Sequence, residues 1–193
     1  MALDKAGLET TAHGFIEVNE FGQTRVPTIF AIGDVNGGTQ LAHVATSQGI
    51  IAAENACGRP TRSYETVIPG VVFTSPEIGL VGLSEQDARQ REIPVKVGKF
   101  PFAWLGRSIA VGNSVGFAKW IACKSTDTLL GAAVVGPHAT ELVAAAAVAI
   151  RAKLKTRELG ATIHAHPTFG EVWMEAAHAV HGMAIHASPV KKA

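Results

Sequence analysis

The stretch SVGFAKWIACKSTDTLLGAAVVG, residues 114–136, predicts two antiparallel strands joined by a tight turn. Both halves are short and β-rich, and the turn-forming residues 125–127 separate them. Similar β-rich segments, divided by glycine, proline, asparagine and aspartate, precede this hairpin from residue 64 onwards. Apolar residues at helical spacing follow it, over about 140–155 and again near the C-terminus. We therefore predict an α+β fold for residues 63–186, with an antiparallel sheet and flanking helices.

Residues 1–62 have a different pattern. The run VPTIFAIGD (26–34) is apolar until it stops at a glycine and an aspartate, which is typical of a strand buried on both faces of a parallel sheet. Residues 41–58 show helical spacing and end at a glycine that suits a C-terminal cap. One such strand and one helix cannot cover each other, so we predict that residues 1–62 are the remnant of a larger doubly wound domain. Residues 187–193 are expected to form an unstructured tail.

The composition is that of an ordinary globular chain, with 47% hydrophobic and 17% charged residues. A net charge of +1, without a lysine–arginine cluster, gives no reason to expect a nucleic-acid partner. The longest apolar run, residues 142–150, is too short to span a bilayer, and no basic-then-apolar leader opens the chain. We therefore expect no membrane association and a cytoplasmic location. Cys57 and Cys123 lack metal-type spacing and are expected to be buried packing residues.

Gly33 and Asp34 end the apolar run, at the position where open α/β sheets bind ligands beyond the carboxyl ends of their strands. A carboxylate there can accept hydrogen bonds from sugar-like hydroxyls, and a glycine allows the backbone to approach a ligand closely. Aspartate is also common in plain turns, so these residues alone leave both interpretations open. His43, one turn into the predicted helix, is on its own typical of a packing or surface residue.

The segment HAHPTFGE, residues 164–171, opens the last predicted helix and allows two interpretations. In the first, Thr168 and Glu171 form a capping box and Pro167 starts the helix, so that the polar residues are structural. In the second, Glu171 reaches back to one ring nitrogen of His166, fixes its tautomer and leaves the other nitrogen as a general base. The two roles would compete for the glutamate oxygens. A metal site is disfavoured, because the histidine pairs in this region have no third ligand at a suitable spacing.

Six segments, taken together in this order and spacing, resemble the FAD-dependent pyridine nucleotide–disulfide oxidoreductases over nearly the whole chain. They are VPTIFAIGDV (26–35), QLAH (40–43), IPGVVFTSPEIGLVGLSE (68–85), FPFAWLGRSIAVGNSVGFAKW (100–120), LLGAAVVGPHATEL (129–142) and HAHPTFGE (164–171). The first two resemble the second flavin-binding motif of the family and the segment after it. The others resemble the interface domain of the family and its histidine–glutamate motif.

The resemblance implies FAD and NAD as cofactors. The position of Asp34 in the family binds the ribityl chain of FAD, and the following segment lies along the isoalloxazine ring. The implied cofactor-binding residues are Gly33, Asp34, Gln40, Leu41, Ala42 and His43. His166, oriented by Glu171, is implied to take the proton from a dihydrolipoyl thiol. The thiolate then attacks a redox disulfide, and electrons pass through FAD to NAD.

The resemblance also implies partners. In the family, the histidine and glutamate serve the flavin and disulfide of the partner subunit, so a homodimer is expected. The second implied partner is a dihydrolipoyl-bearing protein of a 2-oxo acid dehydrogenase or glycine cleavage complex. The continuation MEAAHAVHG (174–182) favours the members that reoxidise dihydrolipoyl groups. Glutathione-type reductases usually carry a second acidic residue where this chain has Val172.

The chain departs from the family pattern in several places. The glycine-rich dinucleotide fingerprint, the C-x4-C redox disulfide and the nicotinamide domain are absent from these 193 residues. We therefore expect the chain alone to be inactive and to bind FAD weakly or not at all. Residues 104–106 and 169–170 are unusual for the family and affect the expected substrate contact surface. The alternative is a dimerisation module with an idle histidine–glutamate pair, or a portion of another flavin disulfide reductase similar to glutathione reductase.

Overall fold

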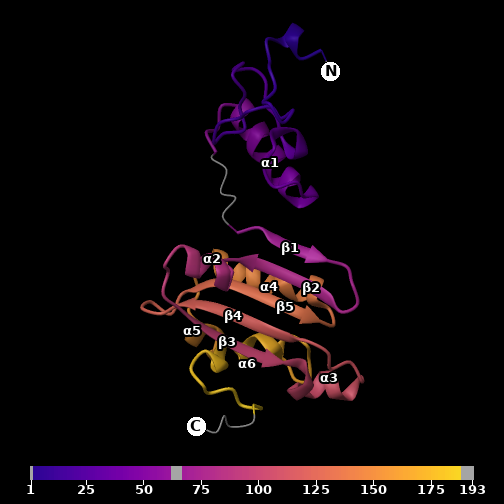
Figure 1. Cartoon of the computed structure of the whole chain (residues 1–193), viewed down its shortest axis with the longest axis vertical. Coiled ribbons are helices and arrows are strands. Elements are labelled where there is room, and N and C mark those ends of the chain that lie inside the picture. The colour runs from indigo at the N-terminus through magenta and orange to yellow at the C-terminus, as the bar shows by residue number, and fades with distance from the viewer. Residues whose placement is uncertain (1, 62–66, 188–193) are drawn as a thin grey trace. The chain divides into compact units, whose positions relative to one another are not determined.

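The computed structural model describes residues 2–61 and 67–187 (Figure 1). The chain divides into two compact units, Met1–Glu65 and Thr66–Ala193. The domain boundary predicted between residues 62 and 63 lies outside the described residues, as does nearly all of the predicted tail, from residue 188 onwards.

The first unit holds one long helix, α1 (Ala42–Ala56), and two short 3₁₀ helices, η1 (Asp4–Ala6) and η2 (Gly33–Asn36). The predicted helix over 41–58 is confirmed. Its buried residues Val44, Gln48 and Ala52 recur every four positions, which places them on one face.

The predicted buried strand over 26–34 is wrong. Within the described part of the first unit, the only β pairing is an isolated antiparallel bridge between Gln23 and Phe30. A parallel strand needs hydrogen-bonded neighbours, and the segment instead folds back on residues just before it, through the bond from Ala31 N to Gly22 O. Ile32 is consequently 40% exposed rather than buried.

The second unit contains a five-stranded, fully antiparallel sheet in the order β1-β2-β5-β4-β3. The strands are β1 (Pro69–Val72), β2 (Glu77–Gly82), β3 (Val95–Pro101), β4 (Phe117–Cys123) and β5 (Leu129–Gly136). The predicted hairpin is therefore confirmed as β4 and β5, in register from Phe117 opposite Val135 to Ala122 opposite Leu129. A register shift at Ile121 and Ala122 marks a bulge.

Within residues 67–187, six helical segments accompany the sheet, and together they confirm the predicted α+β fold. They are α2 (Glu85–Gln90), η3 (Phe102–Trp104), α3 (Gly106–Ala110), α4 (Ala139–Arg151), α5 (Thr156–Ala161) and α6 (Glu171–Ala179). The single helix predicted over about 140–155 is too long. The chain turns at Lys153, whose φ is 55°, and Leu154 then pairs with the end of the hairpin through the bond from Leu129 N to Leu154 O.

Helices α4 and α6 cover one face of the sheet, α4 over β2 and β5 and α6 over β3 and β4. Two strand glycines allow this close contact. A Cβ on Gly79 would lie 2.6 Å from the carbonyl oxygen of Ala139 at the start of α4. A Cβ on Gly98 would clash with the backbone of α6 at Ala176. Any side chain at either position would therefore push a helix off the sheet.

Two buried tryptophans fix α6 in this layer. Trp120 of β4 donates from Nε1 to the carbonyl oxygen of Trp173 at 3.0 Å, and the two rings lie 4.6 Å apart. Trp173 of α6 in turn donates to the carbonyl oxygen of Leu142 in α4 at 3.0 Å. Both indole N–H groups are thus satisfied in the core, as buried tryptophans require. The start of α6 is therefore held on a rigid support.

Candidate active site

The HAHPTFGE segment does not start the helix where the capping-box interpretation places it. Helix α6 begins at Glu171, with Gly170 as its N-cap, so Pro167 and Thr168 lie on the incoming loop. The Thr168 hydroxyl donates to the carbonyl oxygen of Ala165 at 2.7 Å and caps no helix. His166 lies on the same loop, five residues before the glutamate.

Glu171 contacts both the histidine and the loop backbone. Its Oε1 lies 2.8 Å from Nδ1 of His166, and its Oε2 accepts a hydrogen bond from the backbone N–H of Thr168 at 2.7 Å. The expected competition for the glutamate oxygens is therefore wrong, because the histidine and the Thr168 N–H each contact a different oxygen. The Glu171 side chain is only 8% exposed, whereas that of His166 is 68% exposed. A buried carboxylate thus holds an outward-facing imidazole.

This geometry favours one tautomer of His166. A carboxylate beside Nδ1 favours a proton on that nitrogen and leaves the lone pair on Nε2. Within the described residues, Nε2 has no hydrogen-bond partner, so it is available to a proton donor from outside. The arrangement is that of a general base with its orienting group. Gly106, the first residue of α3, borders the ring, since a Cβ there would lie 3.7 Å from Cε1 of His166.

An aromatic cluster supports the same loop. The ring of Phe169 lies 5.0 Å from that of His138 and 6.1 Å from that of Phe102, in tilted and edge-on contacts. Val172 and Trp173 follow Glu171 into the core and are almost completely buried. Phe169, which is unusual for the family, is therefore held by contacts with both rings.

The predicted flavin segment lies in the other unit, on η2 and the start of α1. Gly33 is buried with a φ of 71°, and its N–H donates to the side-chain oxygen of Gln48 at 2.6 Å. The same oxygen accepts a bond from the Asn36 amide at 3.1 Å. Asp34, between them, has an exposed side chain. Gln48 thus attaches the turn at residues 33–36 to α1 through two hydrogen bonds.

Gln40, Leu41, Ala42 and His43 run continuously from that turn into the first turn of α1. Leu41 is half-buried, and the other three are exposed. Sequence reasoning missed the role of Gln48. The available signal was a polar residue on the otherwise apolar helix face.

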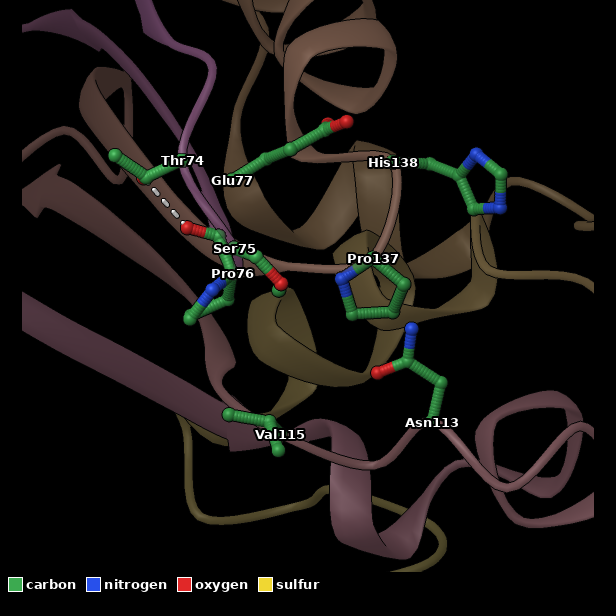
Figure 2. A pocket seen from close by; sticks show the side chains of 9 residues that line it. Thr74, Ser75, Pro76, Glu77, Asn113, Val115, Pro137 and His138 are labelled. Carbon is green, nitrogen blue, oxygen red and sulfur yellow. Dashed lines mark hydrogen bonds between the residues drawn. The ribbon is translucent and has the colours of Figure 1, made fainter.

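A pocket of about 530 Å³ lies apart from these two segments, where the β1–β2 loop meets the β5–α4 loop (Figure 2). Thr74, Ser75 and Pro76 lie across it from Asn113 and Pro137 (Figure 2). None of these residues was predicted as a site residue.

Glu77, also in that lining, is already bonded within the fold. Its Oε2 accepts from the backbone N–H and the hydroxyl of Thr140, at 3.0 and 2.8 Å. These bonds, the backbone one foremost, hold the pKa of Glu77 below its usual value. The carboxylate therefore caps the start of α4 and has a structural role there.

The structure also gives the surroundings of the two cysteines. The expectation that both cysteines are buried is wrong, since Cys57 is exposed and Cys123 half-buried, and both are free thiols. Among residues 2–61 and 67–187, no group of three or more His, Cys, Asp or Glu side chains is placed to hold a metal ion. No helix in the described part of the chain is long and apolar enough to cross a membrane.

Comparison with known proteins agrees with the fold. Residues 68–177 match the pyridine nucleotide-disulphide oxidoreductase dimerisation domain. The chain belongs to the pyridine nucleotide-disulphide oxidoreductase family. Residues 1–49 match a second sequence pattern of the pyridine nucleotide-disulphide oxidoreductases.

Named relatives of this family member are dihydrolipoyl dehydrogenases. The chain is 45% identical over 192 residues to that of Chlamydia trachomatis, covering 100% of this chain and 41% of the relative. It is 46% identical over 186 residues to the dihydrolipoyl dehydrogenase of Thermus scotoductus, covering 96% of this chain and 40% of the relative. The crystal structure of LpdA from Mycobacterium tuberculosis superposes with a TM-score of 0.86 at 29% identity, over 92% of this chain and 39% of that one. The chain thus spans about two fifths of the length of the relatives that it matches.

Proposed function

We propose that this chain is the part of a dihydrolipoyl dehydrogenase that supplies the proton acceptor and the dimer interface. The observation that carries the proposal is the His166–Glu171 pair, in which a buried carboxylate orients an exposed imidazole at 2.8 Å. The match to dihydrolipoyl dehydrogenases along the whole chain supports dihydrolipoyl groups as the substrate class. The reaction is the oxidation of a dihydrolipoyl dithiol.

In this reaction, Nε2 of His166 takes the proton of one substrate thiol, and Glu171 stabilises the resulting imidazolium. The thiolate then attacks a disulfide supplied by a part of the enzyme outside these residues. A bound FAD would supply the two-electron redox chemistry by which the enzyme dithiol is reoxidised with NAD. The exposed ring of His166 can return its proton to water before the next turnover.

The residues of the predicted flavin segment present polar groups at the surface. Asp34 has an exposed carboxylate at the start of η2, and Gln40 and His43 have exposed side chains. Gly33, by contrast, is buried against α1, where a Cβ would lie 3.1 Å from the Cβ of Ala45. We assign Gly33, Asp34 and the segment Gln40–His43 to FAD binding. In the same proposal, residues 1–62 are the end of the FAD domain and residues 63–186 the interface domain.

We also assign a homodimer and a dihydrolipoyl-bearing protein of a 2-oxo acid dehydrogenase or glycine cleavage complex as partners. The match of residues 68–177 to the dimerisation domain of the family supports the dimer. Ile163, three residues before His166, is 96% exposed, and Ile109 of α3 is 61% exposed. The two free thiols are compatible with the reducing cytoplasm, where we place the enzyme.

A hybrid enzyme tests the proposal. This chain replaces the matching 192 residues of the Chlamydia trachomatis dihydrolipoyl dehydrogenase. We expect a yellow dimer that reduces NAD with dihydrolipoamide. The 193-residue chain alone should show no such activity, because the disulfide that receives the electrons lies outside it. A folded, flavin-loaded hybrid that reduces glutathione disulfide instead would contradict the assignment.

A further inference from the structure

Gly106, the exposed first residue of α3, lies at the edge of the His166 ring. A Cβ at this position would lie 3.7 Å from Cε1 of His166. Among the described residues outside α3 and the two chain neighbours, Cε1 is the only atom within 4 Å of that point. Cε1 is the ring carbon between the two nitrogens, so it is bonded to Nε2, the nitrogen that takes the proton in the proposed reaction. Gly106 therefore borders the space beside the proposed base.

Neither the backbone nor the packing of the fold requires a glycine at this position. The φ of Gly106 lies outside the left-handed region that favours glycine. A Cβ would make an ordinary van der Waals contact there, whereas at Gly79 and Gly98 it would clash with a helix. Glycine is also a poorer helix former than alanine. What the glycine provides is empty space beside the imidazole.

Packing fixes this space on both of its sides. Helix α3 is anchored by Leu105 and Ser108, which are almost completely buried. Just before α3, the buried ring of Phe102 contacts the ring of Phe169 at 6.1 Å, and Phe169 lies three residues after His166. The start of α3 and the histidine loop are thus joined through the aromatic cluster. A larger side chain at position 106 would meet a ring that is held in place.

We propose that Gly106 is a specificity-determining residue, which leaves space beside Nε2 of His166 for the chain that the reacting dithiol carries. This inference rests on the proposed function. A dihydrolipoyl group has its two thiols on carbons that are separated by one other carbon, and its acyl chain leaves from one of the sulfur-bearing carbons. When a thiol of this group approaches Nε2, the substituents next to the sulfur lie alongside the imidazole. A glycine admits them on the Cε1 side, and a larger residue excludes them.

The test uses the hybrid enzyme with Gly106→Val, in which the two methyl groups of valine take up the space beside Cε1. We expect reduction of the enzyme by dihydrolipoamide to slow by about 10- to 100-fold, because a small displacement of the reacting group costs that much. The compound 1,3-propanedithiol has the same two thiols without the chain, so its rate should change little. Stopped-flow measurement of flavin absorbance follows both reactions.

Two further variants complete the comparison. Gly106→Ala adds a single methyl group at contact distance, so it should slow dihydrolipoamide selectively but by less than the valine does. If the valine enzyme does not bind flavin, the alanine enzyme decides by the same comparison of the two dithiols. Gly70→Val, on β1, is the matched control and should change neither rate, because a Cβ there would meet nothing within 4 Å.

The results that contradict the inference differ from those that contradict the proposed function. Rates with dihydrolipoamide that equal those of the parent in both Gly106 variants would overturn the inference. An equal loss with both dithiols would also overturn it, because that result indicates a displaced base and not a loss of space. If His166→Gln leaves the oxidation of both dithiols intact, the proposed function itself fails.

Discussion

Cys123, the last residue of β4, has a thiol 3.3 Å from the hydroxyl of Ser125. Hydrogen bonds from the Ser125 hydroxyl first, and then from Thr126, lower the pKa of this thiol to about 6. The thiolate should therefore predominate at pH 7, and we expect iodoacetamide to alkylate Cys123 at a rate that levels off above that pH. Ser125→Ala should move the midpoint of this rate profile upwards. Mass spectrometry measures the alkylation rate of Cys123 in the parent and in Ser125→Ala, with Cys57 followed in the same sample. A rate that keeps rising through pH 8–9 would contradict the assignment.

At the scale of single residues, the sequence predicted contacts between near neighbours only. The His166–Glu171 contact could be predicted because the two residues are five positions apart and the glutamate lies in the first helical turn. Glu175 and His186 are eleven positions apart, with a helix end between them, so no spacing rule indicates their contact. The clamp by Gln48 on Gly33 spans 15 residues for the same reason.

Among the elements, the β4–β5 turn is joined to α5 and to the end of α6 through Asp127. Its carboxylate accepts bonds from Lys96 at 2.9 Å and from the Thr156 hydroxyl at 2.7 Å, and lies 3.3 Å from Nε2 of His181. Burial raises the pKa of Asp127, but the hydrogen bonds from Thr156, Lys96 and the Arg157 N–H outweigh it and hold the pKa at about 2. The charged form is thus strongly favoured in the folded protein.

A depressed pKa of this kind stabilises the fold above the unfolded value of about 4, and the contribution is lost as the pH falls towards 2. Asp127→Asn should therefore lower the free energy of unfolding by about 2 kcal/mol at pH 7. Asparagine tolerates the left-handed backbone of this turn, where φ is 64°, so the change tests the charge. Urea unfolding at a series of pH values should show the difference between the two proteins shrinking between pH 4 and pH 2. A constant difference over that range would mean that the turn geometry matters and the charge does not.

At the scale of the whole molecule, the α+β fold and the family could be predicted because alternating strands, turn residues and ordered motifs are local features of the sequence. The prediction of a strand over 26–34 was wrong because such a strand depends on contacts that are not local. Its apolar run has the composition of a strand within a parallel sheet, but composition cannot supply the neighbouring strands that such a sheet requires. The support of α6 by Trp120 and Trp173, which are 53 residues apart, also depends on the completed fold.

We propose His166 as the proton acceptor of a dihydrolipoyl dehydrogenase, and one substitution in the hybrid enzyme tests this role most directly. His166→Gln should lower the turnover of dihydrolipoamide by about 10²- to 10⁴-fold, because a positioned general base contributes that much. Electron transfer from NADH to an artificial acceptor at the flavin needs no such base, so its rate should change little. Steady-state rates of the two reactions, measured on the same flavin-loaded sample, provide the comparison. Dihydrolipoamide turnover that survives the substitution intact would contradict the claim, and so would an equal loss of both activities.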